Sequence, residues 1–130
     1  IDLVVRGNCS LVTGVPRISD SIRINGIIDR YLEHPRIFIF ANGGEEKYYI
    51  GSADWMPRNL DNRIEVLTPV LDKKLMDNIL KQIVNPQLAD NTHAWELLSD
   101  GSYKKIKREA GAVAMDSQSH IKRVLNLLKR

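Results

Sequence analysis

The residues best suited to chemistry lie in the first half of the chain, beside short apolar runs. Arg6 follows the run at residues 1–5, His34 precedes another run, and the segment G-S-A-D-W-M-P-R-N at residues 51–59 follows a third. A neutral imidazole is both a nucleophile and a proton carrier near neutral pH, which suits histidine to phosphoryl or phosphodiester chemistry. His34 is therefore the candidate catalytic residue. The alternative is a histidine with a structural or merely exposed role.

Arginine dominates the positive charge of this half. The first 63 residues contain seven arginines and a single lysine, Lys47. A guanidinium group presents a planar fork of N–H donors that matches phosphate oxygens, so this bias indicates a phosphorylated ligand. Composition leaves open the alternative of seven solvated surface arginines. The arginines are Arg6, Arg17, Arg23, Arg30, Arg36, Arg58 and Arg63.

Alternating apolar residues predict the strands that position these residues, and turn residues predict which strands pair. Two runs joined by G-G-E-E at residues 43–46, and two joined by S-D-G-S at residues 99–102, indicate β-hairpins. Residues 7–20 are rich in glycine, proline and small polar residues and suit a long loop. The expected strands are residues 1–5, 21–28, 36–42, 47–52, 64–69, 95–98 and 103–106.

Helical periodicity is strongest in the second half. Asp72 can cap a helix whose apolar residues recur at helical spacing until Pro86. A last helix is expected at residues 117–128, and one helical turn at residues 29–33. The mixture predicts an α/β (α+β) fold with a central mixed β-sheet flanked by helices.

Bulk properties narrow the class of protein. A chain of 130 residues with 43% apolar content suits one domain, residues 1–130, with a core of ordinary size. No run approaches the roughly 20 uncharged apolar residues of a membrane-spanning helix, and the lone Cys9 favours a reducing compartment. The net charge of +3 is only mildly basic. We therefore expect a soluble, cytoplasmic protein with at most peripheral membrane association and no nucleic-acid partner.

Two short motifs are similar to the second half-site of the phospholipase D superfamily, in which H-x-K precedes one strand and G-S-x-N follows the next. Here H-P-R stands at residues 34–36 and G-S-A-D at residues 51–54. Arg36 replaces the usual lysine, and Asp54 replaces the usual asparagine. The aspartate expected a few residues after the lysine is absent.

A longer series of motifs resembles the final domain of the polyphosphate kinases that use a phosphohistidine. L-E-H-x-R at residues 32–36 and W-M-P-R-N at residues 55–59 carry the resemblance, with V-V-R-G-N-C-S at residues 4–10 and D-N-R-I-E-V at residues 61–66. It covers about residues 1–85, and the remainder agrees only in general character. The resemblance implies a phospholipase-D-like domain of an enzyme that reversibly transfers the terminal phosphate of ATP to inorganic polyphosphate with Mg²⁺.

The resemblance also implies roles for individual residues. Arg6 matches the family's nucleotide-phosphate-contacting arginine, His34 its second active-site histidine, and Arg63 a further arginine directed at the phosphates. Fixed guanidinium groups stabilise the charge that phosphoryl transfer spreads over the equatorial oxygens. For His34 we expect an acid or hydrogen-bonding role. The secondary candidates, which either shape the floor of the site or form a purely structural turn, are Arg36, Ser52, Asp54, Arg58 and Asn59.

Other parts of the enzyme follow from the resemblance as expectations. The phosphohistidine and the Mg²⁺ ligands belong to the preceding domain, so no metal ligand is expected in this chain and an isolated copy is expected to be inactive. The expected partners are ATP or ADP, polyphosphate, the preceding domains of the same polypeptide and further copies of the enzyme. Trp55 and Met56 are expected to pack in the core at the turn, with a nucleotide-stacking pair as the alternative. His93 and His120 are expected to have no special role.

Two other functions remain open. A phospholipase-D-like phosphodiesterase or nuclease could assemble its site from two identical half-sites, although Arg36 and Asp54 count against it. A non-catalytic module that binds polyanions would not need His34, and its affinity would fall steeply with salt.

Overall fold

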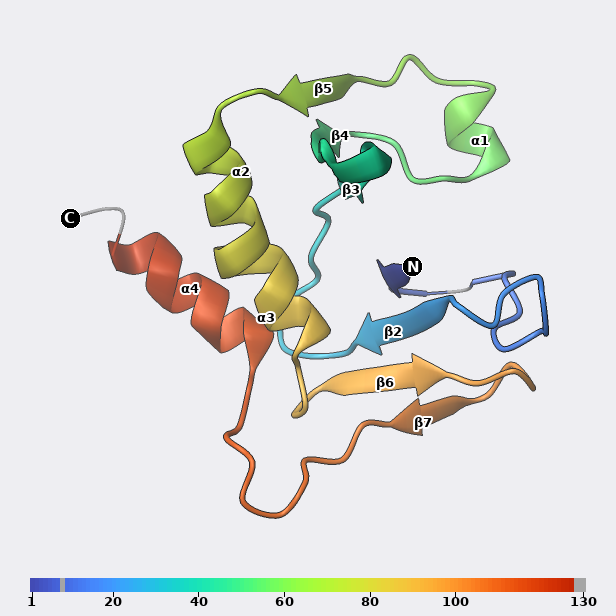
Figure 1. Cartoon of the computed structure of the whole chain (residues 1–130), viewed down its shortest axis with the longest axis vertical. Helices are drawn as coiled ribbons and strands as arrows, with labels where there is room; N and C mark the ends of the chain where they lie inside the picture. The colour runs from blue at the N-terminus through green and yellow to red at the C-terminus, as the bar shows by residue number, and fades with distance from the viewer. Residues whose placement is uncertain (8, 128–130) are drawn as a thin grey trace. The chain divides into compact units, whose positions relative to one another are not determined.

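The computed structural model describes residues 1–7 and 9–127, and the chain forms two compact units. The first unit comprises Ile1–Tyr31 and Leu80–Arg130, and the second comprises Leu32–Ile79. Figure 1 labels most of the helices and strands of both units. No helix in the described ranges is long and apolar enough to span a membrane.

The first unit is built on a four-stranded mixed sheet in the order β1-β2-β6-β7. Strand β1 (Asp2–Val4) runs parallel to β2 (Arg23–Ile27), whereas β6 (Ala94–Leu97) is antiparallel to both β2 and β7 (Tyr103–Lys105). The predicted mixed sheet and the predicted hairpin around residues 99–102 are therefore confirmed. Apolar side chains of the two central strands form the buried core of this sheet, namely Ile24, Ile27, Ala94 and Leu97.

The described residues of the long loop between β1 and β2, residues 5–7 and 9–22, form turns and bends but no helix or strand, in agreement with the loop predicted for residues 7–20. Side chains hold it to the sheet and to itself: Thr13 Oγ1 donates a hydrogen bond to the Leu97 carbonyl at 3.1 Å, and the buried Ser19 Oγ donates to the Val12 carbonyl at 2.6 Å. Gly26 in β2 is required by a close approach, because a Cβ atom there would lie 3.1 Å from the Val5 carbonyl oxygen.

The helix that begins after Asp72 extends further than predicted. Asp72 Oδ1 accepts hydrogen bonds from the backbone N–H groups of Lys74 and Leu75, at 2.7 and 3.1 Å, which confirms the cap. The prediction that the helix ends at Pro86 is wrong, because Pro86 lies in the first turn of a further short helix. Proline is tolerated there because the N–H groups of a helix's first turn form no hydrogen bond within that helix. Helix α2 (Lys73–Ile79) belongs to the second unit, whereas the π-helix η2 (Leu80–Val84) and α3 (Asn85–Leu88) belong to the first.

The C-terminal helix α4 (Ser117–Leu127) confirms the predicted last helix, and Leu128 lies outside the described residues. Asp116 caps it, since its Oδ1 accepts a hydrogen bond from the Ser119 N–H at 2.9 Å. The prediction of a helical turn at residues 29–33 is wrong. The Gln118 side chain in α4 instead holds the Tyr31 backbone, since its Oε1 accepts a hydrogen bond from the Tyr31 N–H at 2.9 Å and its Nε2 donates one to the Tyr31 carbonyl at 2.8 Å.

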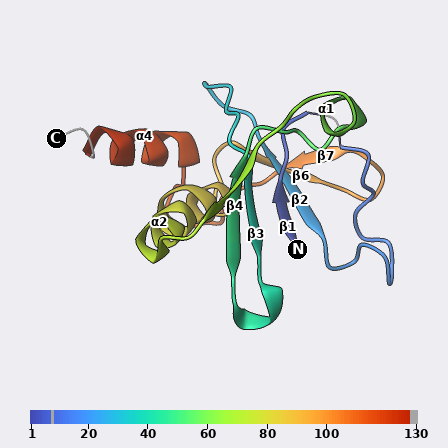
Figure 2. The same ribbon diagram turned by 90° about the horizontal axis from the view of Figure 1, so that it is seen from above.

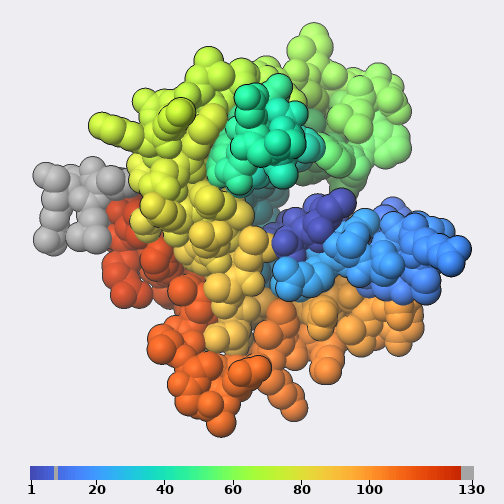
Figure 3. All heavy atoms as spheres, in the orientation of Figure 1, coloured from blue at the N-terminus to red at the C-terminus, as the bar shows by residue number. Residues whose placement is uncertain are grey.

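The second unit contains a separate antiparallel sheet in the order β3-β4-β5. Strands β3 (Ile37–Phe40) and β4 (Lys47–Gly51) form the predicted hairpin, joined by the short 3₁₀-helix η1 (Asn42–Gly44) and seen along its length in Figure 2. Strand β5 (Leu67–Val70) pairs with β4. One central sheet was predicted, but these three consecutive strands satisfy their hydrogen bonds with one another. The remaining helix, α1 (Pro57–Leu60), lies at the surface of its unit and is green in Figure 3.

Candidate active site

An ion pair joins the two segments that carry the phospholipase-D-like motifs in the second unit. Arg36 lies just before β3 and Asp54 just after β4, and antiparallel pairing of these strands brings the two residues together. The Nε and Nη2 atoms of Arg36 lie 3.1 and 3.0 Å from Asp54 Oδ1. Arg36 Nη1 also donates a hydrogen bond to the His34 carbonyl at 2.9 Å. Arg36 thus fixes the backbone of His34 relative to the end of β4.

The segment after β4 is held by two further polar side chains. Ser52 Oγ donates a hydrogen bond to Glu65 Oε2 and accepts one from the Val66 N–H at 3.0 Å, so Ser52 ties the end of β4 to the segment before β5. Asn59 is buried, and its Nδ2 donates to the Asp54 carbonyl at 3.3 Å. The Oδ1 atom of Asn59 is buried without a hydrogen-bond partner among residues 1–7 and 9–127. Ser52 and Asn59 therefore hold the turn in place.

Three cationic or titratable side chains of this unit point to solvent. The side chains of His34, Arg58 and Arg63 are exposed and form no ion pair within the part of the chain that the structure describes. Trp55 and Met56 were predicted to pack in the core, but they are 70% and 40% exposed. The Trp55 ring stacks on Phe38 with ring centroids 5.2 Å apart. The surface around the turn therefore combines exposed basic side chains with the exposed ring of Trp55.

Arg6 lies in the first unit, directly after β1 and its neighbour Val5. Its side chain is exposed, and Nη1 donates a hydrogen bond to the Tyr31 carbonyl at 3.4 Å. The same carbonyl accepts the 2.8 Å hydrogen bond from the nearly buried Gln118. No carboxylate pairs with Arg6 among the described residues. Most of its five N–H donors consequently remain available to a ligand.

Comparison with known proteins decides the family. Residues 1–118 match the family described as "Polyphosphate kinase C-terminal domain 2". The chain belongs to this family. It is 53% identical over 106 residues to a polyphosphate kinase of Pseudomonas aeruginosa, an alignment that covers 82% of this chain and 15% of that protein. It is 49% identical over 119 residues to a polyphosphate kinase of Thermosynechococcus vestitus, covering 92% of this chain and 16% of that protein.

A solved structure agrees with the family membership. The crystal structure of polyphosphate kinase from Porphyromonas gingivalis matches 98% of this chain with a TM-score of 0.89 and 41% identity, and the match covers 19% of that protein. The mixed α/β class predicted from the sequence is thereby confirmed. The chain spans 15 to 19% of the length of these polyphosphate kinases.

The structure brings together only some of the residues that the sequence singles out in this polyphosphate kinase domain. Arg36, Asp54, Asn59 and the backbone of His34 form one connected group. Ser52 belongs to a second group with Glu65, and Arg6 lies in the other unit. The convergence of Arg6, His34 and Arg63 on one ligand stays a prediction.

Sequence reasoning missed the support for Arg6. Gln118 clamps the Tyr31 backbone across 87 residues of sequence, and that backbone in turn accepts the hydrogen bond from Arg6. No local signal points to such a pair, because an amide side chain on a helix is ordinarily solvated. The sequence also carries no signal for the ion pair between Arg36 and Asp54.

The Arg36–Asp54 ion pair is expected to contribute a coupling free energy of about 0.5–1 kcal/mol, because side chains this open to solvent interact only modestly. The two side chains are 25% and 43% exposed. Urea unfolding of Arg36→Gln, Asp54→Asn and the double variant measures the coupling. The matched control is the Arg23–Asp2 pair, which is 76% and 39% exposed and should couple less. Equal coupling in both pairs would show that Arg36 and Asp54 are not held in this geometry.

Proposed function

We propose that this chain is the second phospholipase-D-like catalytic domain of an ATP:polyphosphate phosphotransferase, which reversibly transfers the terminal phosphate of ATP to inorganic polyphosphate. Membership of the polyphosphate kinase family supports this function. The single observation that carries this proposal is the exposure of two arginine side chains. Arg6 and Arg63 present exposed guanidinium groups that no carboxylate pairs with in the described residues, so both can receive phosphate oxygens.

The residues of this chain act on the phosphates by position and charge. Phosphoryl transfer spreads negative charge over the equatorial oxygens of the moving group, and a fixed guanidinium stabilises that charge without exchanging a proton. Arg6 and Arg63 bind the phosphates of the nucleotide. His34 donates a hydrogen bond or a proton to the transferred phosphate or to its leaving oxygen. The phosphohistidine intermediate forms on a residue of the preceding domain.

The Mg²⁺ that the family implies does not fit the residues of this candidate site. Mg²⁺ in nucleotide enzymes binds through one or two carboxylates together with phosphate oxygens. Here the Asp54 carboxylate forms an ion pair with the Arg36 guanidinium, and the Glu65 carboxylate accepts a hydrogen bond from the Ser52 hydroxyl. We therefore assign the Mg²⁺ ligands to the preceding domain and derive no step of the reaction from the ion.

The remaining partners follow from the length of the relatives. The chain spans 15% of the Pseudomonas aeruginosa protein, which leaves room for further domains in a polyphosphate kinase of that size. In this proposal the preceding domains of the same polypeptide complete the site, the enzyme is a homo-oligomer in the cytoplasm, and the present domain is inactive alone. ATP, ADP and polyphosphate are its small-molecule partners.

Arg6→Ala and Arg63→Ala in the complete enzyme are each expected to lower kcat by about 10²–10³-fold, the usual loss when one fixed donor to a charged transition state is removed. The assay measures polyphosphate formed from ATP. Arg108→Ala is the matched control, since Arg108 is an exposed arginine outside the candidate site, and it should keep wild-type activity. Normal activity of both Arg6→Ala and Arg63→Ala would contradict the proposed function of this domain.

A further inference from the structure

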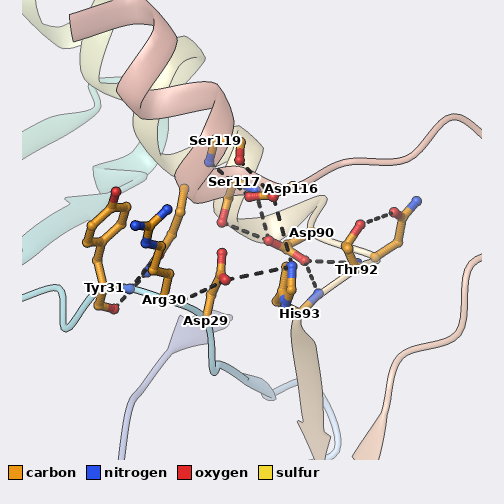
Figure 4. A network of polar contacts seen from close by, with 11 residues as sticks. Asp29, Arg30, Tyr31, Asp90, Thr92, His93, Asp116, Ser117 and Ser119 are labelled. Carbon is orange, nitrogen blue, oxygen red and sulfur yellow. Dashed lines mark hydrogen bonds and ion pairs between the residues drawn. The ribbon is translucent and has the colours of Figure 1, made fainter.

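Three potential metal ligands from distant parts of the sequence lie together in the first unit (Figure 4). Asp29 follows β2, His93 immediately precedes β6, and Asp116 immediately precedes α4. His93 Nε2 lies 3.7 Å from Asp29 Oδ1 and 3.9 Å from Asp116 Oδ2, and one ligand atom from each residue lies within 4.8 Å of the others. All three side chains are half-buried. None of them belongs to the candidate active site.

The backbone positions of this cluster are fixed by a buried carboxylate outside it. Asp90 is 2% exposed, and its Oδ1 accepts a 2.7 Å hydrogen bond from the His93 N–H. Its Oδ2 accepts hydrogen bonds from the N–H and the hydroxyl of Ser117, the neighbour of Asp116, at 2.9 and 2.8 Å. One buried side chain therefore holds two of the three ligand-bearing segments in register, and Figure 4 shows Asp90 between them.

Both carboxylates of the cluster also have hydrogen-bond donors that orient them. Asp116 Oδ1 accepts the Ser119 N–H at 2.9 Å, and its Oδ2 accepts the Ser119 hydroxyl at 2.8 Å. Asp29 Oδ1 accepts the Arg30 N–H at 2.6 Å. Outer hydrogen bonds of this kind hold ligating carboxylates in place in metal sites. Each carboxylate oxygen still has a lone pair for a further bond.

The negative charges of the cluster favour the binding of a cation. Two half-buried carboxylates within 4.8 Å of each other repel, and His93 is the only basic side chain that lies at ion-pair distance from either of them in residues 1–7 and 9–127. A neutral imidazole supplies no positive charge, but its ring nitrogen is a metal ligand. A dication bound between the three side chains would neutralise both carboxylates and use the imidazole at the same time.

We propose that Asp29, His93 and Asp116 form a binding site for a divalent transition-metal ion of the Zn²⁺ class. One imidazole nitrogen and two carboxylate oxygens form a three-ligand set of the kind that holds Zn²⁺ with a fourth position left for water or another oxygen ligand. In tetrahedral coordination with bonds of about 2.1 Å, neighbouring Zn²⁺ ligand atoms lie about 3.4 Å apart. The distances of 3.7 and 3.9 Å from His93 Nε2 to the two carboxylate oxygens therefore need only small side-chain rotations to reach this geometry. The imidazole disfavours Mg²⁺ and Ca²⁺, which prefer oxygen ligands.

Bound metal would join three elements of the unit. The ligands come from the end of β2, the start of β6 and the N-terminus of α4, so the ion would fasten the C-terminal helix to the sheet. A ligand that binds the folded chain and not the unfolded chain stabilises the folded state by RT ln(1 + L/Kd), where L is the concentration of the free ion, so the unfolding temperature rises with that concentration. This site is independent of the proposed phosphotransferase reaction and can be tested without an activity assay.

The test is a calorimetric titration of the 130-residue chain with ZnCl₂, followed by thermal unfolding with and without the ion. We expect one Zn²⁺ per chain and a higher unfolding temperature. Asp29→Asn, His93→Gln and Asp116→Asn should each weaken binding by at least about tenfold. Asp116→Asn is the sharpest of these variants, because asparagine caps a helix as well as aspartate does and preserves the fold of α4.

Two control variants separate this site from adventitious zinc binding. His120→Gln removes a different histidine, which lies in α4 and whose Nε2 contacts Gln82 Oε1. Cys9→Ser removes the single thiol. Both should bind Zn²⁺ as the wild type does. Failure of the folded wild-type chain to bind Zn²⁺, or binding that Asp29→Asn and Asp116→Asn leave unchanged, would overturn the proposal.

Discussion

Replacing His34 with alanine in the complete polyphosphate kinase is expected to lower kcat by about 10²–10⁴-fold, the usual contribution of a positioned general acid or base. The imidazole is exposed and has no hydrogen-bond partner among the described residues, so it can meet a substrate. The contact that holds this residue uses its backbone carbonyl, which accepts the Arg36 guanidinium. Alanine keeps that carbonyl, and the effect should therefore fall on catalysis and leave stability unchanged.

A second substitution at the same position separates the two roles left open for His34. His34→Gln keeps an N–H donor but cannot carry a proton. If His34 only donates a hydrogen bond, this variant retains much of the activity that alanine loses. If it donates a proton, the two variants are equally impaired. His120→Ala serves as the control, because that histidine lies on α4 outside the candidate site.

The outcome of this experiment also separates the alternative functions. Wild-type activity of His34→Ala, together with polyphosphate binding that weakens steeply with salt, would favour a polyanion-binding module. Hydrolysis of a phosphodiester by the wild type would favour a phospholipase-D-like phosphodiesterase. The Arg36–Asp54 ion pair counts against the phosphodiesterase, because the two residues that replace the usual lysine and asparagine of the motifs bind each other.

Sequence patterns predict the parts of this fold that are determined locally. The β3–β4 and β6–β7 hairpins follow from apolar runs joined by turn residues, and the start of α2 follows from the Asp72 cap. The division of the strands into two sheets is a matter of long-range pairing, which no local pattern encodes. The turn at residues 29–33 was mispredicted for the same reason, because its backbone partner, Gln118, lies 87 residues from Tyr31.

The candidate site is predictable to the extent that its residues share a motif. The predicted hairpin around residues 43–46 accounts for the proximity of Arg36 and Asp54, since the two residues flank its strands. The motifs do not reveal that the two side chains form an ion pair. The Asp29, His93 and Asp116 cluster has no motif at all, because each ligand comes from a different element of the first unit.

Asp90→Ala is expected to lower the free energy of unfolding by about 3 kcal/mol, because it removes a buried charged acceptor and leaves its donors without a partner. Asp90 accepts hydrogen bonds from the N–H groups of Thr92, His93 and Ser117 and from the Ser117 hydroxyl. These bonds join the turn before β6 to the first turn of α4. Asp61→Asn, at an exposed aspartate of the other unit, is the control and should change stability by less than about 0.5 kcal/mol.

The same network makes stability depend on pH in acid. Burial raises the pKa of Asp90, but hydrogen bonds from His93, Ser117 and Thr92 together outweigh burial and hold the pKa below its usual value of 3.8. The folded state therefore binds this proton more weakly than the unfolded state does. The stabilisation is complete above the ordinary aspartate pKa and is lost as the pH falls through the lowered pKa of the folded state. Urea unfolding of the wild type from pH 7 into this acid range should show a loss that Asp90→Asn lacks, and parallel acid profiles for the two proteins would contradict the role given to Asp90.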